Sequence, residues 1–332
     1  MTAEQFDVVG IGNAIVDVIA QSDNAFLESE GLSKGSMTLI DNERAARLYG
    51  GMGPAREVSG GSAANTLVGV SALGGRAAFV GKVRNDQLGG IFRHDIRASG
   101  VEYKTPEAHE GEATARCLIF VTPDAQRTMC TYLGAAVSLD ATDVPEDLVA
   151  AAKITYLEGY LWDQAPAKEA FLKAAKVAHS AGQRVALSLS DPFCVDRHRE
   201  SFRDLVAHHV DLLFANESEI TSLYQVSDFD AALAAVRGHC EVAALTCSEK
   251  GSYVLSGETC HKIDAVPVQK VVDTTGAGDL YAAGFMAGFT QGRDLKRCGQ
   301  MGALAAAEVI SHYGARPESS LSDLVADRLG DA

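Results

Sequence analysis

Short apolar runs alternate with segments of helical periodicity through most of the second half of the chain. Runs such as 184–189 and 212–215 have the length of buried strands, and each is followed by a segment whose apolar positions recur at helical spacing. A repeated strand–helix order favours a parallel sheet with helices on both faces. The pattern therefore predicts an α/β fold.

This reading gives specific elements. We expect strands at 77–80, 154–157, 184–189, 212–215, 241–246 and 261–265. We expect a helix that opens in the segment 60–66 and runs to 73, and further helices at 87–99, 168–181, 199–206, 218–223, 229–236, 280–291 and 295–312.

Two stretches lack this alternation, one before residue 60 and one at 101–136. The second holds two strand-like runs around the turn 122–125, which is typical of a β-hairpin. The first begins with an apolar run that ends in glycines, continues with an alternating run at 15–20, and then becomes mostly polar, with a short helix expected at 43–49. We expect the two stretches to meet as a small sheet beside the core.

The chain is thus expected to be a single unit, residues 1–332, with two parts. The large α/β part would comprise about 1–12, 55–100 and 137–332. The small β lid would comprise about 13–54 and 101–136.

Charge and cysteine content narrow the function classes. The net charge of −15 argues against a protein that holds nucleic acid or an anionic membrane by overall electrostatics. Seven scattered cysteines without a CxxC pair suit reduced thiols in a cytosol better than a disulfide framework or a zinc site. No stretch reaches the roughly 18 apolar residues of a membrane span. We expect a soluble cytoplasmic protein that acts on a small molecule.

The segment Asp-Thr-Thr-Gly-Ala-Gly-Asp at 273–279 precedes an expected helix. Backbone N–H groups at a helix N-terminus bind anions such as phosphate, and the glycines flanking Ala277, Gly276 and Gly278, permit a close approach. Asp279 lies in the first helical turn, where it can take the proton from an attacking hydroxyl. Phosphoryl transfer requires this combination of charge stabilisation and positioning.

The same segment alone could be an ordinary glycine turn with an acidic residue at a helix start. A dinucleotide-binding alternative at Gly10 and Gly12 fails, because the third glycine of GxGxxG would fall on Ile15. A Walker GxxxxGK[ST] loop is absent from the sequence.

Further motifs agree with a known family. Residues 273–279, with Ala-Ala-Gly-Phe at 282–285, resemble the C-terminal signature of the ribokinase-like (PfkB) carbohydrate kinases. Gly-Gly-Ser-Ala-Ala-Asn at 60–65 resembles the family's N-terminal glycine signature, and 216–219 resembles its NxxE motif. The resemblance spans residues 8 to about 317. It implies a three-layer fold with a mainly parallel central sheet, a small β-sheet lid, and use of ATP and Mg²⁺.

The resemblance also implies roles for individual residues. The substrate would be held by Asn13, Asp17, Gly61, Ser62, Asn65 and Arg127. The nucleotide would be held by Asn216, Glu219, Thr246, Ser248, Gly251 and Thr275, with Ser248 in place of a family glycine. K⁺ near Asp273 and Thr275 is implied in the same way.

Two of these assignments also have a reason in the residues themselves. Asp17 lies in an apolar strand, where a carboxylate needs a partner, and a carboxylate can accept two hydroxyl hydrogen bonds from a diol. Asn216 and Glu219 have the spacing of a capping box, and the resemblance adds a role in organising Mg²⁺ through water.

Three features resemble the adenosine kinase branch more than the sugar kinases. They are the GNxxxD form at 12–17, the strand at 114–117 and the LSxPF-like segment at 188–193. They imply phosphorylation of a nucleoside 5′-hydroxyl, adenosine to AMP. A sugar kinase acting on ribose, fructose or a related carbohydrate is the alternative, and a non-catalytic nucleoside or sugar sensor is a third reading. Met37, where animal adenosine kinases have a polar residue, leaves the base contacts open. Both a monomer and a homodimer are compatible with the sequence.

Overall fold

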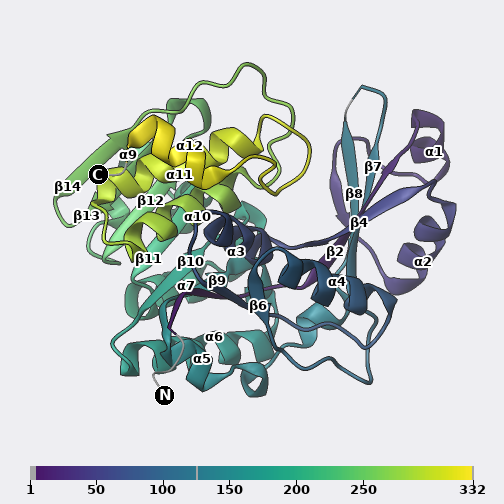
Figure 1. The fold of residues 1–332 in the computed structure, drawn as a ribbon, viewed down its shortest axis with the longest axis horizontal. Helices are drawn as coiled ribbons and strands as arrows, with labels where there is room; N and C mark the ends of the chain where they lie inside the picture. Colours follow the sequence, from purple (N-terminus) through teal and green to yellow (C-terminus); the bar gives the residue numbers. More distant parts are fainter. Residues whose placement is uncertain (1–4, 125, 331–332) are drawn as a thin grey trace.

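The computed structural model describes residues 5–124 and 126–330, and two sheets organise this part of the chain (Figure 1). The larger sheet has the strand order β14-β13-β12-β11-β10-β9-β1-β5-β6. Its strands are β1 (Phe6–Ile11), β5 (Ala77–Val80), β6 (Val101–Tyr103), β9 (Ala152–Glu158), β10 (Arg184–Ser188), β11 (Leu212–Asn216), β12 (Val242–Thr246), β13 (Ser252–Ser256) and β14 (Thr259–Ile263).

All neighbours from β6 to β12 are parallel, and only β13 and β14 add an antiparallel edge. The α/β fold with a mainly parallel sheet and a second, small sheet is therefore confirmed. In a parallel sheet the carboxyl ends of the strands share one edge, and loops at that edge form the usual ligand site.

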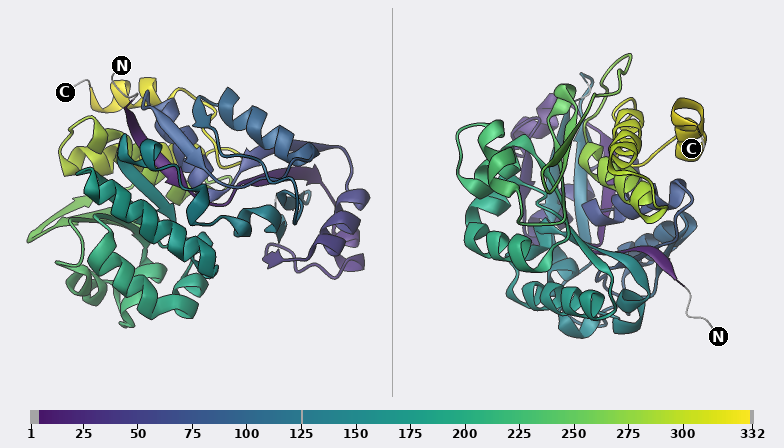
Figure 2. Two further views of the ribbon diagram at one scale, coloured as in Figure 1. Left: turned by 90° about the horizontal axis from the view of Figure 1, so that it is seen from below. Right: turned by 90° about the vertical axis from the view of Figure 1, so that its left-hand side faces the viewer.

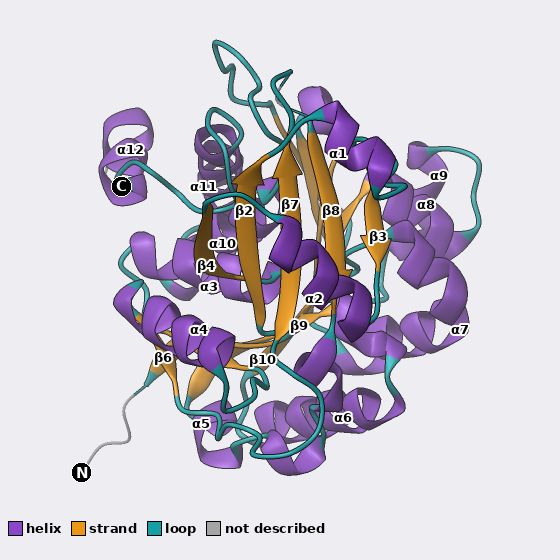
Figure 3. Ribbon diagram, turned by 90° about the vertical axis from the view of Figure 1, so that its right-hand side faces the viewer, coloured by secondary structure: helices purple, strands orange, loops and turns teal. Residues whose placement is uncertain are grey.

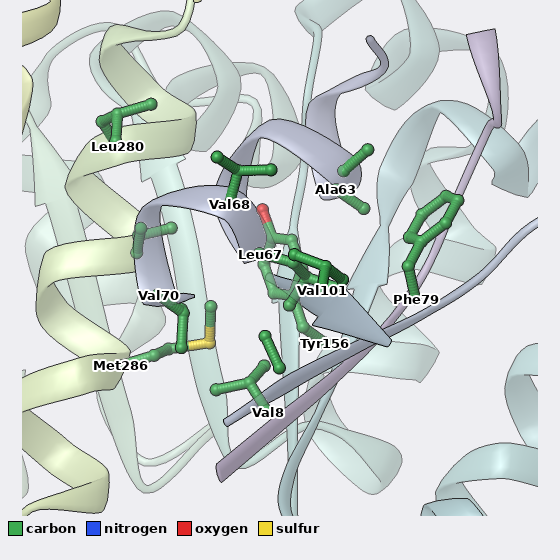
Figure 4. Packing of buried hydrophobic residues seen from close by; sticks show 14 of the residues in the cluster. Val8, Ala63, Leu67, Val68, Val70, Phe79, Val101, Tyr156, Leu280 and Met286 are labelled. Atoms are coloured by element: carbon green, nitrogen blue, oxygen red, sulfur yellow. The ribbon is translucent and has the colours of Figure 1, made fainter. Parts of the chain in front are cut away.

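Helices cover both faces of the larger sheet (Figure 2). On one face pack α3 (Ser62–Ala72), α4 (Gln87–Ala98), α10 (Ala277–Thr290), α11 (Leu295–Val309) and α12 (Leu321–Leu329). On the other face pack α5 (Glu146–Ala150), α6 (Ala165–Ser180), α7 (Pro192–His209), α8 (Glu217–Tyr224) and α9 (Phe229–Val236). Figure 4 shows the first face, where Leu67 of α3 and Met286 of α10 lie close to Val8 and Tyr156 of the sheet. This packing fixes the starts of α3 and α10 relative to the strand ends.

The smaller sheet has the order β3-β8-β7-β2-β4. Its strands are β2 (Ile15–Gln21), β3 (Met37–Leu39), β4 (Ala55–Gly60), β7 (Ala115–Val121) and β8 (Arg127–Tyr132). The helices α1 (Asn24–Ser29) and α2 (Asn42–Gly51) cover its outer face (Figure 3), where Leu27 and Leu48 are buried against the strands. The inner face of the small sheet faces the larger sheet.

The structure differs from the sequence-based expectations at several elements. β4 lies within the range expected for the large part, yet it pairs antiparallel with β2, from Ile15 opposite Gly60 to Ala20 opposite Ala55. Its polar sequence, Ala-Arg-Glu-Val-Ser-Gly, is that of an exposed edge strand and shows little apolar alternation.

Other differences concern edges and helix lengths. β13 was not expected, and β14 begins and ends two residues before the predicted strand at 261–265. α7 is longer than the expected 199–206, and its helical geometry is interrupted at His198 (φ −126°, ψ 24°), next to the start of the expected helix. α12, capped by Ser320, was also missed. None of the elements that differ carries a predicted site residue.

Candidate active site

One cavity of about 750 Å³ lies between the smaller sheet and the carboxyl-end edge of the larger sheet. Thirteen of the predicted site residues line it, from strand ends, helix starts and the inner face of the small sheet. They are Asn13, Asp17, Gly61, Ser62, Asn65, Asn216, Glu219, Thr246, Thr275, Gly276, Ala277, Gly278 and Asp279. The structure thus brings together residues from four separate motifs.

At one end of the cavity α10 begins directly after Gly276. Gly276 has the left-handed φ of 81°, and a Cβ there would lie 2.7 Å from the Cα of Ala315, so only glycine fits. The N–H groups of the first turn of a helix have no acceptor within the helix. Gly276, Ala277 and Gly278 at the start of α10 line the cavity, which makes this end a site for phosphate, and the Ala277 N–H already donates to the Thr274 carbonyl at 3.2 Å.

Asp279 lies beside this helix start and accepts two hydrogen bonds from α3. The Ser62 hydroxyl donates to Oδ1 at 2.6 Å, and the Asn65 amide nitrogen donates to Oδ2 at 3.2 Å. Burial raises the pKa of Asp279 to about 6, although the two hydrogen bonds act in the opposite direction. A carboxylate with a pKa near neutrality, fixed beside an anion site, is suited to general base catalysis.

Asp17 projects from β2 into the same cavity, and its carboxylate lies beside Gly60 of β4. A Cβ at position 60 would come within 2.4 Å of the Asp17 carboxylate, so the glycine makes room for it. Burial raises the pKa of Asp17 to about 6, attraction to Arg316 and Arg127 lowers it, and repulsion from Asp279 adds to the rise. No residue in the described part of the chain donates a hydrogen bond to this carboxylate, so it can accept two from a ligand.

Glu158, at the end of β9, is a buried carboxylate of this cavity that was not predicted. It accepts hydrogen bonds from the backbone and side-chain nitrogens of Asn13 (3.3 and 2.7 Å) and from the Ala63 N–H (2.9 Å). The Asn13 Oδ1 is left buried and without a partner among the described residues. The position of Glu158 directly after a buried strand was a signal that could have identified it.

Asn216 and Glu219 form the capping box that their spacing predicted. The Glu219 carboxylate accepts hydrogen bonds from the backbone and side-chain nitrogens of Asn216 (2.9 and 2.6 Å), and the Glu219 N–H donates to the Asn216 side chain at 2.9 Å. Burial raises the pKa of Glu219 to about 7. Because both oxygens already accept one hydrogen bond, this donor set fits Mg²⁺ held through its water shell. When bound, Mg²⁺ would neutralise charge on the phosphates.

Three predicted residues are not part of the cavity lining. Arg127, at the start of β8, forms an ion pair with Asp273 and donates to the Thr275 hydroxyl at 3.2 Å. Ser248 and Gly251 lie in the turn after Thr246, with φ of 49° and 89°. Ser248 adopts the left-handed conformation that glycine favours, which agrees with a loop whose usual residue there is glycine.

Large apolar side chains line the cavity from the small sheet and from the larger part. Met37 and Leu39 extend from β3, and Tyr160 and Phe193 face the cavity from the larger part. These four side chains are 48%, 57%, 41% and 71% exposed, which is unusual for large apolar groups lining one cavity. A flat apolar ligand group would find partners there.

An anion site and a base on the wall of one cavity are the requirements of phosphoryl transfer. The fold and the site define a phosphotransferase that acts on a hydroxyl group of a small molecule. The chain belongs to the pfkB carbohydrate kinase family, because the family model described as "pfkB family carbohydrate kinase" matches residues 52–321. As a kinase of this family, it uses ATP as the phosphoryl donor.

Solved structures and curated proteins agree with this assignment. The structure of adenosine kinase from Sinorhizobium meliloti is 52% identical, covers 98% of this chain and 99% of its own, and superposes with a TM-score of 0.90. A probable sugar kinase protein from Rhizobium etli CFN 42 has the same identity, coverage and TM-score. Adenosine kinase from Saccharomyces cerevisiae is 28% identical over 332 residues, which cover 92% of this chain and 95% of the yeast protein. The ribokinase-like fold expected from the sequence is confirmed.

Proposed function

We propose that the protein transfers the γ-phosphoryl group of ATP to the 5′-hydroxyl of a nucleoside, with adenosine as the substrate. The free carboxylate of Asp17 in the cavity is the observation that carries this proposal, since it faces the same space as Asp279. A ribose ring has a hydroxyl pair for Asp17 at one side and a primary hydroxyl for Asp279 at the other. The name of the 52% identical relative from Sinorhizobium meliloti supports the same substrate.

The proposed reaction assigns a task to each wall of the cavity. Asp17, Gly61 and Asn65 hold the ribose hydroxyls, and Asp279 removes the proton from the 5′-oxygen as that oxygen attacks. ATP supplies the phosphoryl group and Mg²⁺ balances its charge. The N–H groups of Gly276 and Gly278 stabilise the negative charge that develops during transfer, since the Ala277 N–H donates to the Thr274 carbonyl. Thr246, Thr275, Asn216 and Glu219 border the space left for the nucleotide.

The apolar walls favour a nucleoside over a free sugar. Met37 and Leu39 on one side, and Tyr160 and Phe193 on the other, offer surface to a base, whereas a sugar alone would leave them in water. Closure of the small sheet over the ligand would bury these side chains and exclude water from the reacting phosphoryl group.

A substrate screen tests the proposal. ATP consumption is measured with adenosine, inosine, guanosine, D-ribose and D-fructose at equal concentrations. We expect the highest kcat/KM with adenosine and at most trace turnover of free sugars. Turnover of a free sugar without turnover of any nucleoside would reject the nucleoside assignment and favour the sugar kinase, a function that the probable sugar kinase from Rhizobium etli supports.

Three further features stay part of the proposal. A cytoplasmic location is supported by seven free cysteines, and no helix in the described part of the chain is long and apolar enough to cross a membrane. K⁺ beside Asp273 and Thr275 would have to share the Asp273 carboxylate with Arg127 and the Gly314 N–H. The small sheet leaves both a monomer and a homodimer possible.

A further inference from the structure

Arg316 belongs to no motif of the sequence, yet its guanidinium lies next to the site. It follows α11 in the loop that leads to α12, and its side chain is only 18% exposed. A charged group with so little exposure needs partners that satisfy its donors. Its partners therefore indicate what the residue does.

The guanidinium donates to three separate elements. Nη2 donates to the Ser59 hydroxyl of β4 at 2.8 Å, and Nη1 donates to Asp95 (3.3 Å) and Ser99 (3.2 Å) at the end of α4. Nε donates to the Asn65 side-chain oxygen of α3 at 3.3 Å. A planar, rigid fork is required to reach all of these at once, which a lysine ammonium cannot do.

The contact with Asn65 determines which end of that amide faces Asp279. Asn65 uses its oxygen to accept from Arg316 and its nitrogen to donate to Asp279. An amide turned by 180° would set its oxygen against the Asp279 carboxylate and its N–H groups against the guanidinium. Both contacts would be repulsive, so Arg316 selects the orientation in which Asn65 donates.

We propose that Arg316 is a positioning residue for phosphoryl transfer, which holds the Asn65 amide so that its nitrogen faces and orients the Asp279 carboxylate. The residue acts through Asn65 and does not touch the reacting atoms. It also ties the edge strand β4 of the small sheet to the same contact, because Ser59 and Asn65 lie on either side of the Gly60–Gly61 connection.

The charge of Arg316 supports the same role. Burial raises the pKa of Asp17, and attraction to Arg316 is the first of the effects that oppose the rise. A guanidinium placed here thus favours the ionised form of the proposed diol ligand, and through Asn65 it favours the ionised form of the proposed base.

The inference rests on the proposed role of Asp279, so the test begins with Asp279→Asn. We then compare Arg316→Met, Asn65→Ala and the double variant in kcat and kcat/KM for adenosine. If Arg316 acts through Asn65, Arg316→Met lowers kcat by about 10- to 100-fold, the loss typical of a misplaced catalytic group. The double variant should then be no slower than Asn65→Ala alone. Arg328→Met, an exposed arginine of α12, is the matched control and should match the unmodified protein.

The pH profile separates positioning from general loss of structure. The acid limb of kcat/KM should move to higher pH by about half to one unit in Arg316→Met, because an effect favouring the ionised carboxylates is lost. A purely structural defect would lower activity equally at every pH. Four other ionisable groups interact with Asp279: Asp17, Tyr156, Glu158 and Tyr160. Of these, Asp17 also loses the attraction to Arg316 in the variant, so its pKa rises in the same direction.

Arg316→Lys keeps the positive charge. It therefore tests the inference even if Arg316→Met fails to fold. It should lose at least about tenfold in kcat, since it cannot reach Asn65 and its other partners together. Wild-type kcat in Arg316→Lys, an unmoved acid limb in Arg316→Met, or additive losses in the double variant would each overturn the inference. Undiminished turnover by Asp279→Asn would instead overturn the proposed base role on which the inference rests, and absence of adenosine turnover by the unmodified protein would overturn the proposed function itself.

Discussion

The two ends of the cavity differ in how far their side chains are already fixed. At the phosphate end, Asp279 is held by Ser62 and Asn65, and the capping box holds Glu219. At the apolar part of the cavity, the side chains of Met37, Leu39 and Phe193 are about half or more exposed, so a bound ligand could cover them. The groups for the reaction are therefore preorganised on the rigid core, whereas recognition of the base depends on ligand binding.

The first prediction removes the central group of the preorganised end. Asp279→Asn keeps the shape of the side chain and abolishes its capacity to accept a proton. We expect kcat to fall by about 10³-fold or more, within the range of general base catalysis, while the dissociation constant for adenosine changes less than about threefold. Steady-state kinetics and calorimetric titration measure the two quantities.

A matched control is available in Asp230, an exposed aspartate in the first turn of α9. Asp230→Asn changes a helix-start acid in the same way but far from the cavity lining, and it should retain full activity. Turnover by Asp279→Asn within tenfold of the unmodified protein would show that another group removes the proton. The preorganised end would then be a binding site and no more.

How much of the site the sequence predicts depends on how local its contacts are. The capping box of Asn216 and Glu219 and the helix start after Gly276 are local features, so the motifs predicted them. Arg316 contacts Asn65 across 251 positions, and Glu158 contacts Asn13 across 145. No spacing rule reports such contacts, because only the folded chain creates them.

The same distinction applies to the fold. Buried parallel strands such as β10 and β11 are continuous apolar runs, and their periodicity predicted them. β4 is an edge strand with two charged residues, Arg56 and Glu57, and its place in the small sheet follows from pairing with β2. Its composition alone resembles that of a loop.

The second prediction acts on the apolar end. Phe193→Ala removes the most exposed of the four apolar side chains of the cavity. Stacking of a base on an aromatic ring contributes about 1–3 kcal/mol, so we expect KM for adenosine to rise about tenfold or more with kcat nearly unchanged. The inhibition constant of D-ribose, which has no base, should stay the same.

Leu172→Ala is the control for this change, because Leu172 is an exposed apolar residue of α6 outside the cavity lining. It should leave KM for adenosine unaffected. Equal weakening of adenosine and D-ribose by Phe193→Ala would mean that Phe193 supports the ribose clamp and does not contact the base. The proposed division between the two ends would then fail at its apolar side.

The third and smallest effect concerns how the preorganised end tunes its base. The Ser62 hydroxyl donates to Asp279 and thereby lowers the pKa of a carboxyl that burial has raised to about 6. Ser62→Ala removes this stabilisation of the ionised form, so the pKa must rise further. The acid limb of kcat/KM for adenosine should therefore move to higher pH by less than about one unit, with nearly full activity above pH 8.

Ser190→Ala removes a hydroxyl of the same cavity that donates to the Ser188 carbonyl instead, and it should leave the acid limb at the same pH. A limb that moves to lower pH in Ser62→Ala would show that this hydroxyl stabilises the protonated acid, and Asp279 would then need another partner to act as a base.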